Sequence, residues 1–142
     1  MKTSARNHFN GIVKDVIVGA VNAEVHVSLK GGDSIVASIT KNSVEALGIK
    51  SGISILALIK APQIILVSDF GGYKISARNQ LAGSILEIKR GPVNAEVDIE
   101  LKGGEKVAAT VTNDSVEGLG LQKGQPVTAV FKASAVLLAV SS

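Results

Sequence analysis

Ser-Ala-Arg-Asn occurs twice in this chain, as residues 4–7 and again as residues 76–79. The two copies lie 72 positions apart, and the sequence after the first copy recurs after the second at the same offset without a gap. When residues 4–67 are paired with residues 76–139, about 27 of the 64 positions are identical. A unit of roughly 70 residues has therefore been duplicated in tandem, and such a repeat decides how the fold is predicted.

The duplication predicts two domains in the 142-residue chain, residues 1–68 and residues 73–142, with residues 69–72 as the linker. A unit this small buries a modest fraction of its surface and is marginally stable alone. The sequence has no cysteine, which excludes disulfides and thiolate metal sites, and His8 and His26 are not repeated in the second unit. Association between units is the remaining source of stability.

Each repeat is expected to contain five strands, with one short helix before the fourth. In the first repeat the strands are expected at residues 10–18, 23–29, 34–39, 53–59 and 63–67, and the helix at residues 40–47. Apolar and polar residues alternate along residues 23–29, and Gly31-Gly32 is typical of a tight hairpin. This order predicts an all-β protein of two tandem five-stranded OB-type Greek-key barrels, each with one short helix.

Two details of the strands lead to further expectations. Gly11 and Gly83 lie inside the first strand of each repeat, which suggests a bulge or tight bend there. Residues 64–67 and 136–140 are apolar at consecutive positions, whereas a strand of a small isolated barrel exposes one face to water. We therefore expect the second face of these last strands to pack on another barrel, within the chain or between chains.

Few polar residues are retained in both copies, and several of them are hydrogen-bond donors: Ser4, Arg6, Thr40, Ser43 and Lys60. Arginine offers a planar fork for oxygen anions, and lysine offers a mobile charge. No carboxylate lies within these segments, although a glutamate follows one helical turn later. A pocket of donors alone favours a fully deprotonated tetrahedral dianion over hydrogen phosphate, because a protonated oxygen needs an acceptor.

Each of these residues also has a simpler interpretation. Arg6 can be a solvated charge, Thr40 and Ser43 can be helix caps, and Lys60 can protect an edge strand from aggregation. Asn22 and its counterpart in the second repeat are typical turn residues. No one of these features is specific when it is taken alone.

Four motifs occur in the same order in both repeats: Ser-Ala-Arg-Asn, Val-Asn-Ala-Glu-Val, Thr-x-x-Ser-Val and Lys-Ala. Together they resemble the molybdopterin-binding-protein-like domain, called Mop, of the TOBE group. Two copies and little else resemble the di-Mop molbindins, cytoplasmic proteins that store molybdate. The resemblance implies OB-type barrels in a ring of six, hence a homotrimer of this chain, which binds molybdate and usually tungstate between barrels.

The resemblance also implies the site residues. One kind of molybdate site would use Ser4, Ala5, Arg6, Thr40, Ser43, Lys60 and Ala61, and in the other copy Ser76, Ala77, Arg78, Thr112, Ser115, Lys132 and Ala133. A second kind, near the threefold axis, would use the turns at Asn22, Ala23, Asn94 and Ala95. Some family members carry serine where this chain has Ala61 and Ala133, which leaves only the backbone N–H as a donor there.

The main alternative is an OB module that binds nucleic acid. Such modules stack bases on aromatic side chains in a basic groove, but this chain has four aromatic residues and a formal net charge of +3. A second alternative is a regulatory fragment, since TOBE domains also end ATPases and helix-turn-helix repressors, but no P-loop and no extra helical domain is evident in this sequence. No nucleophile–base constellation or secretory leader is evident either, and no apolar run is long enough for a membrane helix. We therefore expect a cytoplasmic binding protein that is not an enzyme and has no organic cofactor, no metal cation site, and no nucleic-acid or membrane partner.

Overall fold

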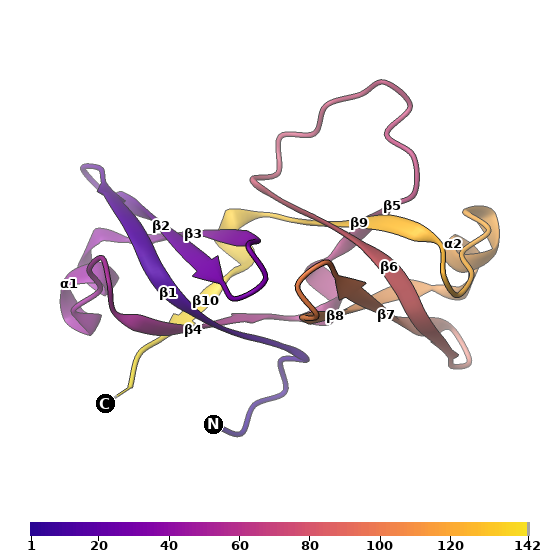
Figure 1. Cartoon of the computed structure of the whole chain (residues 1–142), viewed down its shortest axis with the longest axis horizontal. Coiled ribbons are helices and arrows are strands. Elements are labelled where there is room, and N and C mark those ends of the chain that lie inside the picture. The colour runs from indigo at the N-terminus through magenta and orange to yellow at the C-terminus, as the bar shows by residue number, and fades with distance from the viewer. Residues whose placement is uncertain (142) are drawn as a thin grey trace.

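The protein is described by a computed structural model that covers residues 1–141. It consists of two five-stranded antiparallel sheets placed side by side, with a short helix at each outer end (Figure 1). The first repeat contains β1 (Asn7–Val18), β2 (Asn22–Leu29), β3 (Ser34–Thr40), α1 (Lys41–Leu47), β4 (Ser54–Ile59), the 3₁₀ turn η1 (Ala61–Gln63) and β5 (Ile65–Val67). The second repeat contains β6 (Asn79–Arg90), β7 (Asn94–Leu101), β8 (Lys106–Thr112), α2 (Asn113–Gly118), β9 (Pro126–Phe131), η2 (Ala133–Ala135) and β10 (Leu137–Ala139).

The predicted element order is confirmed in both repeats, and so are the mostly β fold and the five-stranded sheets. Along β2 the alternation places Val25, Val27 and Leu29 in the core, while the residues between them face outward. The 3₁₀ turns η1 and η2 were not predicted. They occupy only three residues each and directly follow Lys60 and Lys132.

The last strands are exchanged between the two repeats. The strand order is β10-β4-β1-β2-β3 in one sheet and β5-β9-β6-β7-β8 in the other. The fifth strand of the first repeat thus completes the sheet of the second repeat, and the reverse holds for β10. In Figure 1, β4 and β9 run toward the opposite barrel before their last strands begin. Neither half of the chain therefore builds a complete sheet from its own residues.

The exchange explains what covers one of the two apolar faces of each last strand. Leu66 is buried in the second barrel, whereas its neighbour Ile65 is 63% exposed, and Leu137 of β10 is 64% exposed. One apolar face is thus covered within the chain by the other barrel. The outer face at Ile65 and Leu137 is uncovered in a single chain.

The glycines inside β1 and β6 were expected to mark a bulge or a tight bend, but the bulges lie at other residues of these strands. The register shifts lie between Val13 and Asp15 in β1 and between Ile85 and Glu87 in β6, so the extra residues are Lys14 and Leu86. Gly11 instead marks a close approach, because a Cβ there would lie 2.7 Å from the carbonyl oxygen of Ser28. The strands bend sharply at both features, which lets five short strands curl around a core.

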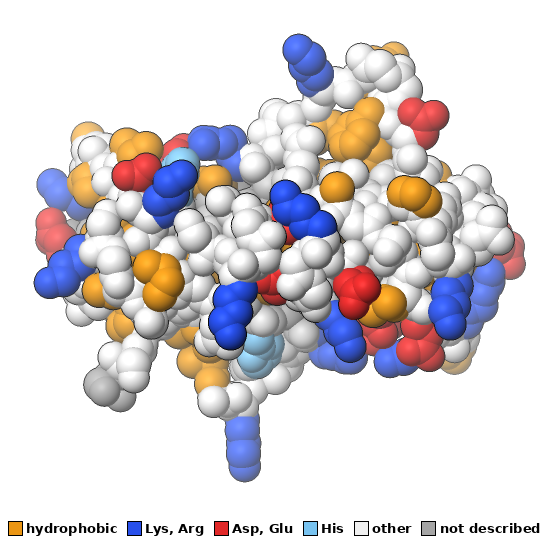
Figure 2. Space-filling view, viewed as in Figure 1, with side chains coloured by type: hydrophobic (Ala, Val, Ile, Leu, Met, Phe, Trp, Pro, Cys, Tyr) orange, Lys and Arg blue, Asp and Glu red, His pale blue; other side chains and the backbone are white. Residues whose placement is uncertain are grey.

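Charged side chains of both signs are interspersed over the face of the molecule shown in Figure 2. No helix within residues 1–141 is long and apolar enough to span a lipid bilayer.

Candidate anion-binding site

A pair of hydroxyl groups begins each short helix. Thr40 caps α1, because its Oγ1 accepts a hydrogen bond of 3.1 Å from the backbone N–H of Ser43, and the two side-chain oxygens are 2.8 Å apart. Thr112 and Ser115 repeat the arrangement at α2, with distances of 3.0 and 2.9 Å. Each hydroxyl has one hydrogen and two acceptor positions. One hydroxyl hydrogen of each pair therefore stays available, so the same residues serve as caps and as donors.

A cavity of about 420 Å³ lies where the first repeat crosses the second barrel. The second repeat contributes Asn94, Thr112 and Ser115 to its walls, and the first contributes the segment from Pro62 to Leu66. η1, which begins at Ala61, packs on β8 of the other repeat, whereas Lys60 and Ala61 themselves do not line the cavity. The site is thus composed crosswise from both repeats.

The reciprocal arrangement occurs at the first barrel, where η2 packs against β3. Lys132 directly precedes η2, and Ala133 is the first residue of η2. Strand β3 ends at Thr40. The family resemblance assigned the donors of each repeat to one site, which would be completed by donors of a neighbouring barrel. Within one chain, the neighbour of each Lys-Ala segment is the other repeat.

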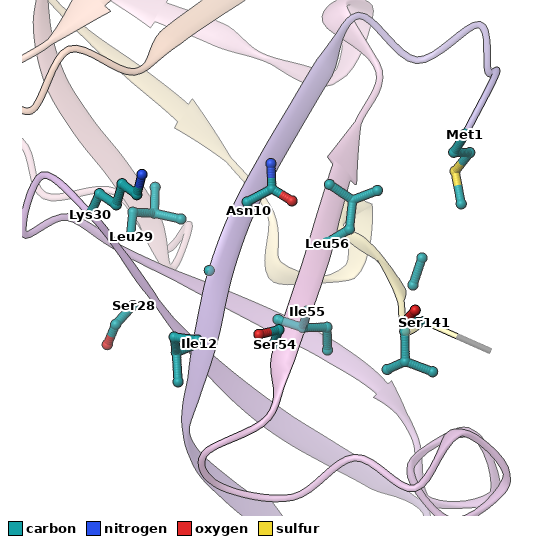
Figure 3. A pocket seen from close by; sticks show the side chains of 13 residues that line it. Met1, Asn10, Ile12, Ser28, Leu29, Lys30, Ser54, Ile55, Leu56 and Ser141 are labelled. Atoms are coloured by element: carbon teal, nitrogen blue, oxygen red, sulfur yellow. The ribbon is translucent and has the colours of Figure 1, made fainter.

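A larger hollow of about 650 Å³ lies on the outer face of the first barrel (Figure 3). Lys30 lies toward one end of it, and Met1 and Ser141 lie toward the other. None of the site residues expected from the sequence lines this hollow. The smaller cavity is the better candidate, because it gathers the duplicated polar groups.

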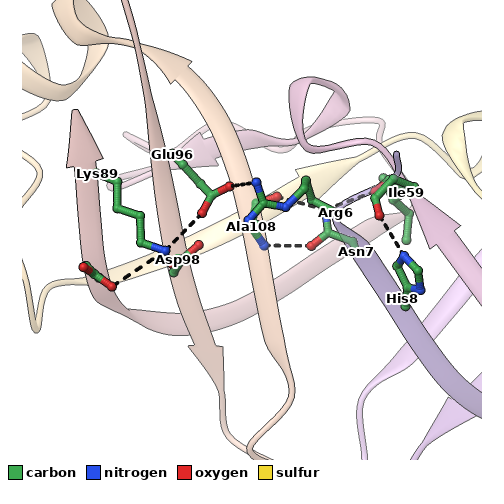
Figure 4. Close-up of polar contacts among 10 residues, drawn as sticks. Arg6, Asn7, His8, Ile59, Lys89, Glu96, Asp98 and Ala108 are labelled. Atoms are coloured by element: carbon green, nitrogen blue, oxygen red, sulfur yellow. Dashed lines mark hydrogen bonds and ion pairs between the residues drawn. The ribbon is translucent and has the colours of Figure 1, made fainter. Parts of the chain in front are cut away.

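Each arginine of the repeated tetrapeptide binds a carboxylate of the other repeat. Arg6 Nη1 lies 2.6 Å from Glu96 Oε1 (Figure 4), and Arg78 Nη1 lies 2.6 Å from Glu24 Oε2. The expectation that the polar set contains donors alone is therefore wrong for the folded protein. The glutamates lie in the Val-Asn-Ala-Glu-Val motif, far from the arginines in sequence, and their retention in both copies was the signal that could have identified them.

The Arg6–Glu96 pair lies beside the cavity. Glu96 and Asn94 are two residues apart on the outward face of β7, a separation of about 7 Å along a strand. In the β7–β8 ladder Asn94 lies opposite Thr112, and Glu96 lies opposite Thr110. Arg6 of the first repeat therefore approaches the same surface that carries the hydroxyl pair of the second repeat.

Asn7 and Asn79 position the two arginines. The side-chain amide of Asn7 pairs with the backbone of Ala108: its Nδ2 donates to the carbonyl oxygen at 2.9 Å, and its Oδ1 accepts from the N–H at 2.7 Å. Asn79 pairs in the same way with Val36, at 2.8 Å for both bonds. Both asparagines are buried, so each fixes the start of one strand against the opposite barrel. They belong to the repeated tetrapeptide but were not among the site residues expected from the sequence.

The remaining expected residues differ in exposure. Ser4, Ser76, Lys60 and Lys132 are exposed, Ala5 and Ala61 are buried, and Ala77 and Ala133 are half-buried. Asn22 and Asn94 are exposed at the starts of their strands, and Ala23 and Ala95 beside them are buried. Within residues 1–141 neither lysine of the Lys-Ala motifs forms an ion pair, so their charges are available, unlike those of Arg6 and Arg78.

The charges around the arginines perturb two neighbouring groups. The hydrogen bond from Arg78, supported by His26, holds the pKa of Glu24 below its ordinary value. The pKa of Lys89 is raised, mainly by a hydrogen bond to Asp98. Both shifts stabilise the charged forms, so these ion pairs persist at neutral pH.

The arrangement is suited to binding an anion and offers little for binding a cation. Of the expected site residues, Asn94, Thr112 and Ser115 line the cavity, and the amide and hydroxyl groups of these side chains can donate hydrogen bonds to an oxygen anion. No group of three or more histidine, aspartate or glutamate residues within residues 1–141 is placed to hold a metal ion.

Comparison with known proteins places the chain in a family. The TOBE domain model matches residues 3–66 and again residues 75–138. The chain belongs to the TOBE domain family. The paired match confirms the tandem duplication and the TOBE resemblance inferred from the four motifs.

Two curated relatives of this TOBE protein are longer than the chain. It is 43% identical over 140 residues to the molybdenum transport protein ModE of Herbaspirillum seropedicae, which covers 99% of the chain and 52% of the relative. It is 41% identical over 140 residues to the molybdenum-pterin-binding protein MopA of Rhodobacter capsulatus, covering 99% and 53%. The chain thus spans about half the length of these relatives.

A solved structure matches this TOBE protein over its whole length. The cytoplasmic molybdate-binding protein ModG, crystallised with molybdate bound, superposes with a TM-score of 0.97 at 45% sequence identity. The match covers 99% of this chain and 100% of that one. The likeness confirms the predicted architecture of two tandem OB-type barrels.

Proposed function

We propose that the protein binds molybdate, and also tungstate, and stores it in the cytoplasm for molybdenum homeostasis. The observation that carries this proposal is the crosswise placement of the duplicated donors. Arg6 pairs with Glu96 of the second barrel, two residues along β7 from Asn94. Asn94 lines the cavity together with Thr112 and Ser115, and the segment after Lys60 forms one wall of it. The likeness to ModG, a molybdate-binding protein, supports the same ligand.

The chemistry of the site agrees with this ligand. Molybdate is a tetrahedral dianion with four acceptor oxygens and no proton at neutral pH, so it pairs with donors on every side. An arginine or lysine about 4 Å from such an anion contributes several kcal/mol of attraction at an effective dielectric constant near 20, before the cost of desolvation. The sites use the residues implied by the resemblance, but each site draws them from both repeats.

We further propose that three chains form a homotrimer of six barrels. Two pairs of exposed apolar side chains occupy equivalent positions of the repeats: Ile65 and Leu137, 63% and 64% exposed, and Val21 and Val93, 72% and 70% exposed. Apolar groups that are exposed at the same place in both repeats are typical of contacts with further copies. Sites near such contacts would be completed by association, and Asn22 and Asn94 beside the valines would form the second kind of site.

The test is calorimetric titration with molybdate at pH 8, combined with light scattering. We expect binding, a trimeric mass, and a higher thermal midpoint with ligand, because a ligand that binds only the folded state stabilises it. Arg6→Ala and Lys60→Ala should each weaken binding about tenfold or more, since hydrogen bonds to charged groups contribute about 1.5–3 kcal/mol.

The matched control is Lys50→Ala, which removes an exposed lysine outside the site and should leave binding unchanged. Absence of molybdate binding at millimolar ligand would overturn the proposal. The same preparation is titrated with a single-stranded oligonucleotide, and tight binding of that probe would favour the alternative nucleic-acid module.

A further inference from the structure

Each arginine of the candidate site is paired with a carboxylate of the other repeat. Glu96 holds Arg6 and Glu24 holds Arg78, both at 2.6 Å, and each pair joins one repeat to the other. The pairing is retained in both copies although neighbouring residues differ. An oxyanion that reaches either arginine must displace this carboxylate or share the guanidinium with it.

We propose that Glu24 and Glu96 are internal competitors of the oxyanion, which bind the same two arginines and thereby set the affinity of each site. The inference rests on the proposed function and adds two residues that the donor set does not include. A carboxylate on the arginine has two effects: it satisfies the guanidinium without ligand, and it repels an approaching dianion. Only an anion with enough charge and enough acceptor oxygens replaces it.

Glu96, the competitor in the second barrel, lies close to two cations, Arg6 and Lys89. Lys89, on the strand beside Glu96, lies 3.6 Å from that carboxylate and 3.4 Å from Asp98, while Glu87 is 4.0 Å from the same lysine (Figure 4). Lys89 therefore draws part of the Glu96 charge from Arg6.

The competitor in the first barrel has a different neighbour. Ile17 occupies the position opposite Glu24 on β1, where the second repeat has Lys89. His26 replaces Asp98, and its Nε2 lies 3.3 Å from Glu24 Oε1. Across the ladder His26 faces Asp15 on β1 and an uncharged residue on β3. Within the described residues, Glu24 thus contacts Arg78 and His26 but no lysine.

This difference makes the two competitors unequal. Within the described residues Glu96 lies close to both Arg6 and Lys89, whereas Arg78 is the one lysine or arginine that binds Glu24. Because Lys89 shares the carboxylate with Arg6, an oxyanion should displace Glu96 more readily than Glu24.

The experiment measures molybdate binding by calorimetry at pH 8 with the full-length protein. Glu24→Gln and Glu96→Gln remove the charge but keep the shape, and each should tighten binding two- to five-fold at its own site, roughly the contribution of an exposed ion pair. Glu100→Gln is the control, because Glu100 lies on the same outward face of β7 and binds no arginine in the described residues. Thermal unfolding of every variant verifies that it is folded.

The lysine is tested by exchange of neighbours between repeats. Lys89→Ile should weaken binding at the Arg6 site about two- to five-fold, and Ile17→Lys should tighten it to the same extent at the Arg78 site. If the wild type binds molybdate but the two Glu→Gln variants bind equally or more weakly, Glu24 and Glu96 are not competitors, and the proposed function stands. If neither the wild type nor the double Glu→Gln variant binds molybdate, the proposed function and the competitor role both fall.

Discussion

Gly31 and Gly103 lie against each other at the boundary between the two repeats, and a Cβ built on either one would overlap the Cα of the other. They are the first glycines of the two Gly-Gly hairpins, so the two hairpin turns contact each other at these residues. The N–H of Gly31 also donates a hydrogen bond of 3.1 Å to Glu105 Oε2 of the second repeat. Close packing of the barrels thus requires the absence of a side chain at both positions.

Gly31→Ala and Gly103→Ala should each destabilise the protein by about 1–3 kcal/mol, the usual cost of a methyl group forced into a packed contact. Urea denaturation measures the loss. The control is Gly118→Ala in α2, where a Cβ would meet nothing within 4 Å and alanine favours the helix. Equal stability of Gly31→Ala and Gly118→Ala would show that the hairpins do not meet as described.

Asn7 is the second test of the contact between repeats. Asn7→Ala leaves the N–H and C=O of Ala108 without their partners in a part-buried position. Unpaired buried backbone groups cost about 1–3 kcal/mol each, so we expect a loss of about 2–4 kcal/mol in the free energy of unfolding. Asn79→Ala should behave alike because of its matching bonds to Val36.

The control for this substitution is Asn10→Ala, an exposed asparagine on the same strand. Denaturation curves in urea should show a shifted midpoint for Asn7→Ala with little change for Asn10→Ala. Shifts of the same size would mean that the amide pairing of Asn7 contributes nothing specific.

The sequence predicts the elements of each repeat well, because they depend on local signals. Alternation along residues 23–29, the Gly-Gly hairpins and the threonine cap of α1 act over a few residues. The exchange of β5 and β10 could not be predicted in the same way. An apolar run such as residues 64–67 predicts a buried strand, but it carries no information about which of two similar sheets that strand joins.

At the candidate site, too, the sequence predicts local features but not contacts between residues that are far apart in the chain. The repeated donors were visible because the two copies could be compared. The partner of Arg6 was not, because Glu96 lies 90 positions away and its motif looked like an ordinary outward strand face. The retention of Glu24 and Glu96 in both copies was a real signal, but it identified no contact until the topology placed each opposite an arginine.

The Arg78–Glu24 pair predicts a small pH dependence of stability. The pKa of Glu24 is lowered in the folded protein, chiefly by the hydrogen bond from Arg78. A depressed pKa means that the pair stabilises the fold above the ordinary glutamate value of 4.5, and that this stability is lost as pH falls through the folded value. Because both side chains are exposed by a third or more, the contribution is below about 1 kcal/mol.

Glu24→Gln should therefore lower the thermal midpoint slightly at pH 7, and the difference from the wild type should shrink between about pH 4.5 and pH 3. Thermal scans across this range measure it, with Glu100→Gln as the control for loss of a charge. A difference that stays constant down to pH 3 would contradict the role of the ionised carboxylate.

The exchanged strands predict how the separated halves of the protein behave. A fragment of residues 1–71 lacks β10, so the edge of β4 is unpaired, and it carries β5 without the sheet that β5 completes. An exposed sheet edge and an unpaired apolar strand both favour association with another chain. Light scattering should therefore find the fragment associated or unfolded, because it cannot complete its sheet alone.

Residues 72–142 have the reciprocal deficiency, since they supply β10 but lack β5. Mixing the two fragments should restore a one-to-one complex with the circular dichroism of the intact protein, because each then provides the strand that the other needs. The control is a full-length chain with several glycine and serine residues inserted between Gly71 and Gly72, where both residues are exposed and the exchange is preserved. If the fragment of residues 1–71 were instead a folded monomer, its last strand would pair within its own sheet, and the exchange would not be needed for folding.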